Sequence, residues 1–152
     1  TQQPMAGDLR ILAAIINIIT DLERIGDHAE GIAKISVAIG KKPLVKPLED
    51  LPKMADQGRS MLERCMKAFV DRDVEAAKAI CHEDDVVDEL YDKNYQELIH
   101  LMVKDPGLIT DATYLTWAAH NLERIADRVT NIAERVVYMV TGKMEEMNVS
   151  KY

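Results

Sequence analysis

A seven-residue segment occurs twice in this chain, and its repetition restricts the fold more than any other feature. The sequence DLERIGD at residues 21–27 returns as NLERIAD at residues 121–127, an offset of 100 residues. In the same register Ile32-Ala33 returns as Ile132-Ala133. Both copies lie in stretches whose apolar residues recur with helical periodicity. We therefore predict a duplicated helical architecture in which a helix near the start is equivalent to one near the end.

The composition is typical of an all-α protein that forms one compact domain. Of the 152 residues, 47% are hydrophobic but only 5% are aromatic, and glycine and proline are sparse. The formal net charge is −7. This charge argues against nucleic-acid binding, because phosphate groups require a basic surface. An acidic chain is better suited to bind cations or a basic protein.

Cysteine usage and hydropathy predict a cytoplasmic protein. Cys65 and Cys81 lie within helical patterns, so we expect them to be reduced and mostly buried. The first residues show no basic region followed by an apolar stretch, and no signal peptide is expected. The longest apolar run, residues 11–19, is interrupted by Asn17 and is shorter than the roughly 20 residues that a membrane span needs.

Four long helices are predicted to account for nearly the whole chain. They cover about residues 6–39, 50–71, 73–103 and 108–141. Gly40 and Gly142 are typical C-terminal stops, and Asp50 is expected to cap the second helix. The front half of the first helix, residues 11–16, is apolar almost all round. We therefore expect that half to be buried on several sides.

Short connections between long amphipathic helices favour an antiparallel bundle. We predict a complete three-helix bundle over residues 47–142, followed by a polar, frayed tail over 143–152. Residues 1–40 are predicted to hold the last helix of a preceding, truncated bundle. This helix carries the repeated segment but lacks two helical partners of its own, so we infer that an N-terminal part is absent.

Three pairs of acidic residues have a spacing of four, which puts both carboxylates on one helix face. The pairs are Glu23 with Asp27, Asp84 with Asp88, and Glu123 with Asp127. Like charges at this spacing destabilise a helix by about 0.2–0.5 kcal/mol per pair. A hard cation such as Mg²⁺, Mn²⁺, Ca²⁺ or iron would compensate for that repulsion. The pairs therefore predict metal binding.

An alternative interpretation needs no metal. Most acidic residues at this spacing are solvated, and Arg24, Arg124 and Arg128 are close enough in sequence to neutralise the pairs. In that case the chain is a purely helical protein-interaction module, and its acidic faces serve solubility or partner contact. Bound metal is the observation that separates the two interpretations.

Other candidate ligands carry weaker signals. His28 follows Asp27, and Asn131 lies four residues after Asp127, so both are possible additional metal ligands. Glu97 and His100 form an isolated Glu-x-x-His, and a carboxylate-bridged di-iron oxidase would need a second such motif. The chain contains no second motif, and it has no nucleophile–base arrangement, glycine-rich phosphate loop or zinc-type cysteine spacing. We therefore predict that it is not an enzyme.

Several of these stretches, in this order, resemble the PhoU family of phosphate-signalling regulators. They are Gln3-Pro4 before Asp8-Leu9-Arg10, DLERIGDH at 21–28, NLERIAD at 121–127, NIAE at 131–134 and VTG at 140–142. The resemblance covers almost the whole chain. It implies an all-α, PhoU-like antiparallel fold built from two three-helix bundles with pseudo-twofold symmetry, of which residues 1–40 and 47–142 supply one helix and one complete bundle.

The resemblance also implies a metal centre. Acidic Glu/Asp-x-x-x-Asp motifs of the family bind divalent metals or multinuclear iron clusters at the surface. The matching residues of the second bundle are Asp84, Asp88, Glu123 and Asp127. The first bundle contributes Glu23 with Asp27, and the motif that would complete its site belongs to a helix this chain lacks.

The function implied by the resemblance is regulatory. PhoU proteins restrain phosphate uptake and the phosphate-starvation response. They link the phosphate ABC transporter to the sensor histidine kinase of a two-component system. A member would be a cytoplasmic adaptor that reaches the membrane through its partners only. We also expect a homodimer, because the apolar first helix needs a covering surface.

Overall fold

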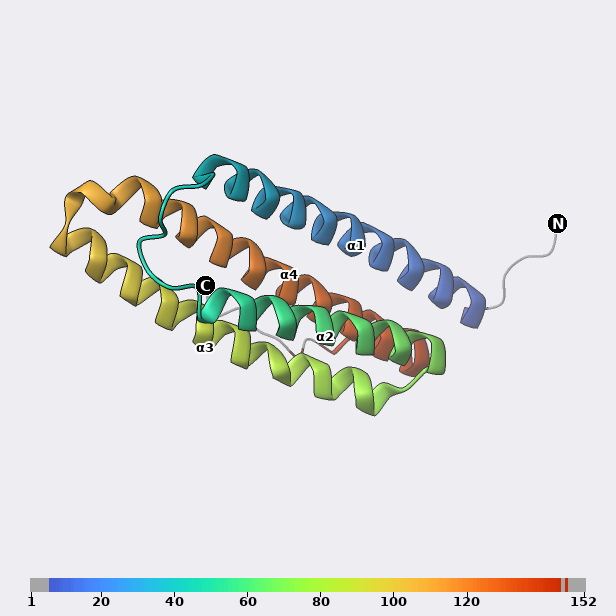
Figure 1. Ribbon diagram of the computed structural model, residues 1–152. Coiled ribbons are helices and arrows are strands. Elements are labelled where there is room, and N and C mark those ends of the chain that lie inside the picture. Colours follow the sequence, from blue (N-terminus) through green and yellow to red (C-terminus); the bar gives the residue numbers. More distant parts are fainter. Residues whose placement is uncertain (1–5, 146, 148–152) are drawn as a thin grey trace.

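The computed structural model describes residues 6–145 and 147, and this part of the chain is helical with no strands. Its elements are α1 (Ala6–Ile39), α2 (Asp50–Asp71), α3 (Val74–Lys104), the short 3₁₀ turn η1 (Pro106–Leu108) and α4 (Ile109–Thr141) (Figure 1). The predicted all-α fold class is confirmed. Each predicted helix is present, with ends that differ from the expected ones by at most about one residue.

Local backbone signals end the helices where the sequence indicated. Gly40 and Gly142 adopt positive φ angles of 65° and 74°, a conformation that costs glycine little. Arg72 also takes the left-handed conformation between α2 and α3. The carboxylate of Asp73 then accepts a hydrogen bond from the backbone N–H of Ala76 at 2.9 Å. This N-cap starts α3 immediately after α2 has ended.

The expected cap at the start of α2 is wrong. Glu49 occupies the N-cap position, and its side chain makes no capping hydrogen bond. Asp50 is instead the first residue of the helix, and its side chain is only 1% exposed. Its two carboxylate oxygens accept from Nζ of Lys93 at 3.0 and 3.1 Å. Asp50 therefore fastens the start of α2 to α3, a long-range contact that the local sequence does not reveal.

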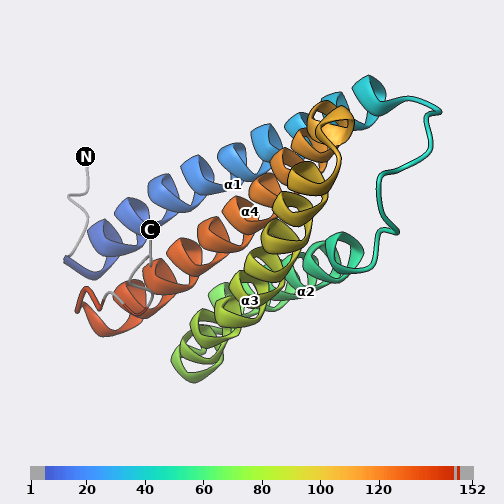
Figure 2. The same cartoon turned by 90° about the vertical axis from the view of Figure 1, so that its left-hand side faces the viewer.

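Helix α4 is the centre of the structure. It packs against α2 and α3 to form a three-helix bundle, and α1 lies along α4 (Figures 1 and 2). Among the described helices, α1 makes backbone contact with α4 alone. The arrangement therefore matches the predicted three-helix bundle with one additional helix attached to its last member.

The core forms where α2 and α3 meet α4. Met54 and Met61 of α2 are completely buried, as are Ala126 and Ala133 of α4. A smaller cluster of Leu98, Ala112 and Leu115 lies where α3 turns into α4. The small alanines let α4 approach its neighbours closely, and the methionines fill the irregular space between helices.

Both cysteines are free and buried, as predicted. The thiol of Cys65 lies 3.8 Å from the carbonyl oxygen of Val129, and that of Cys81 lies 3.8 Å from the carbonyl of Thr130. Burial raises the pKa of each thiol to about 12. Neither thiol is therefore a reactive thiolate at neutral pH.

The expectation that the front half of α1 is buried all round is wrong. Leu12, Ile16 and Ile19 are exposed, and Ile16 exposes 67% of its surface. The reason is that α1 packs against a single helix. The equivalent α4 positions of Leu12 and Ile19 are Ala112 and Ala119, and these are fully buried because α4 also packs against α2 and α3.

The end of the chain is held more closely than a frayed tail would be. Of the predicted tail, residues 146 and 148–152 lie outside the described residues. Glu145 forms an ion pair with Lys78 of α3 at 3.0 Å. The backbone N–H of Met147 donates to the carboxylate of Glu134 on α4 at 2.8 Å. The described part of this segment therefore folds back onto the bundle.

None of the helices in the described ranges has a stretch long and apolar enough to cross a membrane.

Candidate metal centre

Two of the three predicted acidic pairs lie near each other where α3 packs against α4. Asp84 and Asp88 project from α3, and Glu123 and Asp127 project from α4. The carboxylates of Asp84, Asp88 and Asp127 all lie close enough to Glu123 to influence its charge. Asp84 and Glu123 are buried. The structure thus brings together the four residues predicted to form the site of the complete bundle.

Glu123 is the least satisfied member of this group. Its side chain is buried, and its Oε2 atom has no hydrogen-bond partner among the described residues. The closest basic side-chain atoms are Nε of Arg124 at 3.5 Å and Nδ1 of His120 at 3.8 Å. Burial, followed by the neighbouring charge of Asp127, raises the pKa of Glu123 to about 7. An ionised Glu123 therefore requires additional positive charge.

Arg124 supplies part of that charge in the described structure. Its Nη1 donates to Oδ2 of Asp127 at 2.9 Å, and its Nε is the atom nearest to Glu123 Oε2. Arg124 therefore makes the kind of contact with an acidic pair that the metal-free interpretation requires. Arg128 instead lies 3.5 Å from Asp21 on α1, and Arg24 is exposed with no ion pair in the described part of the chain.

His120 lies closer to this centre than the sequence suggested. It is exposed, as expected for a surface residue, but its ring is near Glu123 and 6.2 Å from the ring of Tyr91. Burial lowers the pKa of His120, and the positive charge of Arg124 adds to the effect. The sequence feature that indicates this proximity is the position of His120 three residues before Glu123, because residues at this spacing share a helix face.

A cavity of about 390 Å³ opens beside the centre. It is lined by Tyr91, Asp92, Tyr95, Gln96, His120, Glu123 and Arg124. The rings of Tyr91 and Tyr95 stack with their centroids 6.1 Å apart and form one wall. The side chain of Arg124 therefore contacts Asp127 and also borders this open space.

The third acidic pair stands apart from these four residues. Glu23 and Asp27 are both exposed on α1, which contacts only α4 among the described helices. His28, the predicted additional ligand beside Asp27, is turned toward α4, where its Nδ1 lies 2.9 Å from Oδ1 of Asn121. Gly31 makes room for this contact, since a Cβ atom there would be 3.1 Å from the same oxygen.

Two cross-helix contacts join equivalent positions of α1 and α4. Asp21 contacts Arg128, and Asn121, the equivalent of Asp21, contacts His28, the equivalent of Arg128. This reciprocal pattern means that α1 and α4 run antiparallel about a local pseudo-twofold axis. Positions seven residues apart lie on one helix face, so the two α1 residues of these contacts share one face, as do the two α4 residues.

The carboxylates are assembled but do not form a finished coordination sphere. Within the described ranges, no three His, Cys, Asp or Glu side chains stand in the geometry of a metal site. Asn131, the other predicted additional ligand, is half-buried one turn after Asp127. Coordination therefore requires rotation of side chains, above all of those that contact Arg124.

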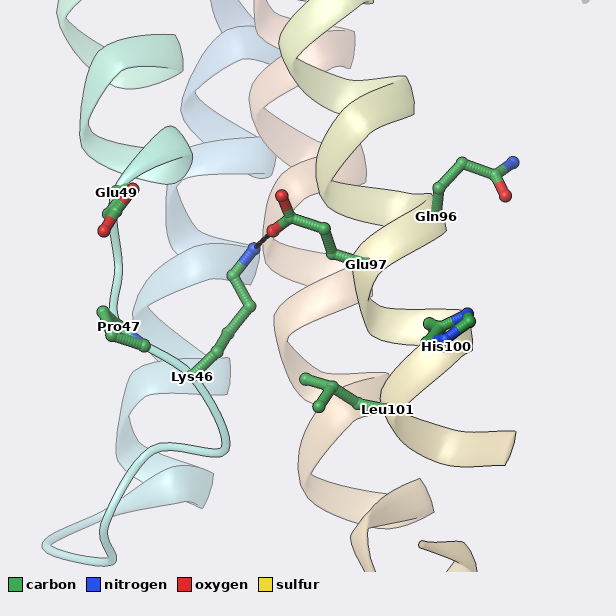
Figure 3. A pocket seen from close by; sticks show the side chains of 7 residues that line it. All are labelled: Lys46, Pro47, Glu49, Gln96, Glu97, His100 and Leu101. Carbon is green, nitrogen blue, oxygen red and sulfur yellow. Dashed lines mark hydrogen bonds and ion pairs between the residues drawn. The ribbon is translucent and has the colours of Figure 1, made fainter. Parts of the chain in front are cut away.

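The Glu97-x-x-His100 motif does not form a ligand pair. Both residues line a cavity of about 560 Å³ together with Lys46, Pro47, Glu49, Gln96 and Leu101. Glu97 points toward Lys46, with which it forms an ion pair, whereas His100 points away from both (Figure 3). Lys46 also donates to the buried Asn94 at 3.0 Å. These contacts hold the connection between α1 and α2 against α3.

Comparison with known proteins identifies the family. The PhoU domain matches residues 1–36 and 51–136. The chain belongs to the PhoU family. The two matched ranges contain one copy each of the repeated segment, so the family resemblance that rested on sequence motifs is confirmed.

Curated PhoU relatives match nearly the whole chain. It is 36% identical over 148 residues to the phosphate-specific transport system accessory protein PhoU homolog of Clostridium acetobutylicum, covering 97% of this chain and 68% of that protein. It is 37% identical over 143 residues to the homolog of the same name from Deinococcus radiodurans, covering 94% and 67%. These names describe an accessory protein and no catalytic activity, in agreement with the prediction that the chain is not an enzyme.

Solved PhoU structures share the fold. The crystal structure of PhoU from Pseudomonas aeruginosa superposes with a TM-score of 0.87 at 34% identity, covering 94% of this chain and 69% of that one. The phosphate transport system regulatory protein PhoU from Streptococcus pneumoniae gives a TM-score of 0.88 at 36% identity, covering 94% and 68%. The chain therefore spans about two thirds of the length of the PhoU relatives described.

Proposed function

We propose that this chain is a metal-binding regulatory adaptor in phosphate homeostasis. Membership of the PhoU family, whose relatives are named accessory proteins of phosphate-specific transport, supports the regulatory part. The observation that carries the metal-binding part is the meeting of two acidic pairs around a buried Glu123 oxygen that lacks a hydrogen-bond partner among the described residues. Such an oxygen is a suitable ligand for a hard cation.

The residues present fit a divalent metal ion or a small iron cluster. Asp84, Asp88, Glu123 and Asp127 would hold it, and Asn131 lies one turn further along α4 as an additional oxygen ligand. Carboxylate oxygens suit Mg²⁺, Mn²⁺, Ca²⁺ and iron, and carboxylates also bridge neighbouring ions. Bound metal would offset the mutual repulsion of the carboxylates and stabilise the contact between α3 and α4. A second site at Glu23, Asp27 and His28 would need ligands from an additional helix.

A Glu123→Ala/Asp127→Ala double variant is expected to lose the bound metal. Wild type and variant are stripped with a chelator, loaded with Mn²⁺ or Fe²⁺, desalted and analysed by metal mass spectrometry. The wild type should retain metal, because four carboxylates face one another, whereas the variant keeps only the α3 pair. Circular dichroism checks that the variant is still helical.

The control for this experiment is Asp85→Ala/Glu89→Ala. These residues lie on α3 with the same spacing of four, and both are exposed. The control should retain as much metal as the wild type. Equal loss from both variants would show a general effect of negative charge, and no metal in the wild type would contradict the proposed centre.

The adaptor role concerns the phosphate ABC transporter and a sensor histidine kinase. We propose that the protein acts at the cytoplasmic face of the membrane, reaches it only through these partners and restrains phosphate uptake and starvation signalling. Tagged full-length protein is expected to capture transporter or kinase subunits from host membranes of phosphate-replete cells. Reproducible failure with intact partners would count against this role. Light scattering on the purified protein tests whether it is the proposed homodimer.

A metal-free interaction module is the second candidate function. It is favoured by Arg124, which already neutralises part of the acidic group, and by the exposed apolar residues of α1. Leu9, Leu12, Ile16 and Ile19 form an apolar stripe of the kind that marks protein contacts. This candidate predicts partner capture without metal, so the metal analysis and the capture experiment together separate the two functions.

A further inference from the structure

The guanidinium group of Arg124 lies where positive charge is most needed in the candidate centre. Its Nη1 is 2.9 Å from Oδ2 of Asp127, and its Nε is 3.5 Å from Oε2 of Glu123. One side chain thus touches both members of the α4 acidic pair. The oxygen of Glu123 nearest to Arg124 is the buried one without a hydrogen-bond partner among the described residues. A metal ion that used both carboxylates would compete with this arginine.

Arg124 lies in an acidic environment. The negative charges of Asp84 and Asp88 on α3 and of Asp127 on α4 act on Glu123, whose carboxylate is also close to Arg124. A divalent or multinuclear centre supplies more charge than a single arginine. A cation of higher charge that used the same two carboxylates would have to displace the contact made by Arg124.

The surroundings of Arg124 provide a place for the displaced side chain. Its side chain is 36% exposed and lines the cavity of about 390 Å³ that is bounded by Tyr91, Tyr95 and His120. The aromatic rings of these three residues line the same cavity. Arginine stacks favourably on the faces of such rings, so movement into this cavity does not leave the group in an apolar environment.

We propose that Arg124 is an internal counter-ion that occupies Glu123 and Asp127 in the metal-free protein and turns into the adjacent cavity when a metal ion binds. This inference rests on the proposed metal-binding function. The inference adds that bound metal determines where the guanidinium group of Arg124 lies. A partner with an acidic or aromatic contact surface would then distinguish the two states.

An Arg124→Gln variant tests the competition. Mn²⁺ binding is measured by isothermal titration calorimetry at pH 8.0 on chelator-stripped wild type, on this variant and on Arg24→Gln. Arg24 holds the equivalent position in the repeated segment, is exposed and has no ion pair within the described residues, so it is a matched control. Arg124→Gln should bind Mn²⁺ about tenfold more tightly, since a charge-assisted hydrogen bond no longer has to be broken. Arg24→Gln should bind within about twofold of wild type.

Equal or weaker binding by Arg124→Gln would overturn the competition. In that case Arg124 positions Asp127 for the metal rather than opposing it. If wild type and both variants bind no Mn²⁺, the proposed metal centre itself is contradicted. This result differs from one in which all three proteins bind Mn²⁺ with the same affinity, which contradicts only the competition. If Arg124→Gln does not fold, a measurement on the wild type alone tests the proposal. Mn²⁺ should increase the phenylglyoxal modification of Arg124, measured by peptide mass spectrometry, and leave that of Arg24 unchanged; no increase would overturn the proposal.

Discussion

Metal-free Glu123→Gln protein is expected to be about 3 kcal/mol more stable than wild type at pH 8 and nearly as stable as wild type at pH 4.5. Burial and the charge of Asp127 raise the pKa of Glu123 from 4.5 to about 7 in the folded state. Between these two values the native state keeps a proton that the unfolded state has lost. The free energy of unfolding of the wild type therefore falls as pH rises through this window, and the loss is complete above pH 7. Glutamine has nearly the same shape, cannot ionise and avoids the loss.

Urea unfolding in the presence of a chelator measures this difference, and the fluorescence of Trp117, the single tryptophan, reports it. Glu23→Gln is the control, because Glu23 holds the equivalent position in α1 and is exposed. Its effect should be small and independent of pH. If Glu123→Gln lowers stability equally at both pH values, Glu123 is ionised in the native state and its pairing with Arg124 outweighs the cost of burial.

Replacement of Leu98 by alanine should destabilise the protein by about 3 kcal/mol, within the range of roughly 2–5 kcal/mol for a large core side chain. Leu98 is completely buried in the small cluster with Ala112 and Leu115. These neighbours join α3 to α4 near the turn between the two helices, in a cluster separate from the main core. Because the cluster is small, few side chains are available to fill the cavity that the substitution leaves.

The adjacent Ile99 provides the comparison for this substitution. Ile99 lies on the same helix but is 37% exposed. Ile99→Ala should change the free energy of unfolding by no more than about 1 kcal/mol. Denaturant unfolding of both variants gives the two values. Similar costs at the two positions would show that this cluster contributes little as a packed core and that the surrounding helices close over the cavity.

The helices could be predicted because their boundaries depend on local chemistry. Gly40, Gly142 and the Asp71-Arg72-Asp73 turn act through backbone conformation and capping, which a few neighbouring residues determine. The exposure of the α1 front half could not be predicted in the same way. An apolar surface indicates that a helix needs partners, but it does not state how many helices of the described chain cover it. That number depends on long-range packing.

The candidate centre was predictable in part for the same reason. A spacing of four identified the acidic pairs, and in the folded chain Asp84, Asp88 and Asp127 lie near enough to Glu123 for their charges to act on it. The different partners of Arg124 and Arg128 could not be predicted from the sequence, since both arginines lie near the same acidic pair. Arg124 turns to Asp127 on its own helix, whereas Arg128 turns to Asp21 on α1. The register between α1 and α4 decides this difference, and only the folded chain sets that register.

The antiparallel contact of α1 with α4 also determines an order of assembly. Its polar pairs join residues 93 and 107 positions apart, so α1 reaches its place only after a very long loop has closed. Helices α2, α3 and α4 are linked by short connections and pair at lower entropic cost. We infer that the carboxylates of α3 and α4 are assembled before α1 arrives. Detachment of α1 would then uncover one side of α4 and leave this acidic group in place, so the acidic group and the first helix are separable units of the same chain.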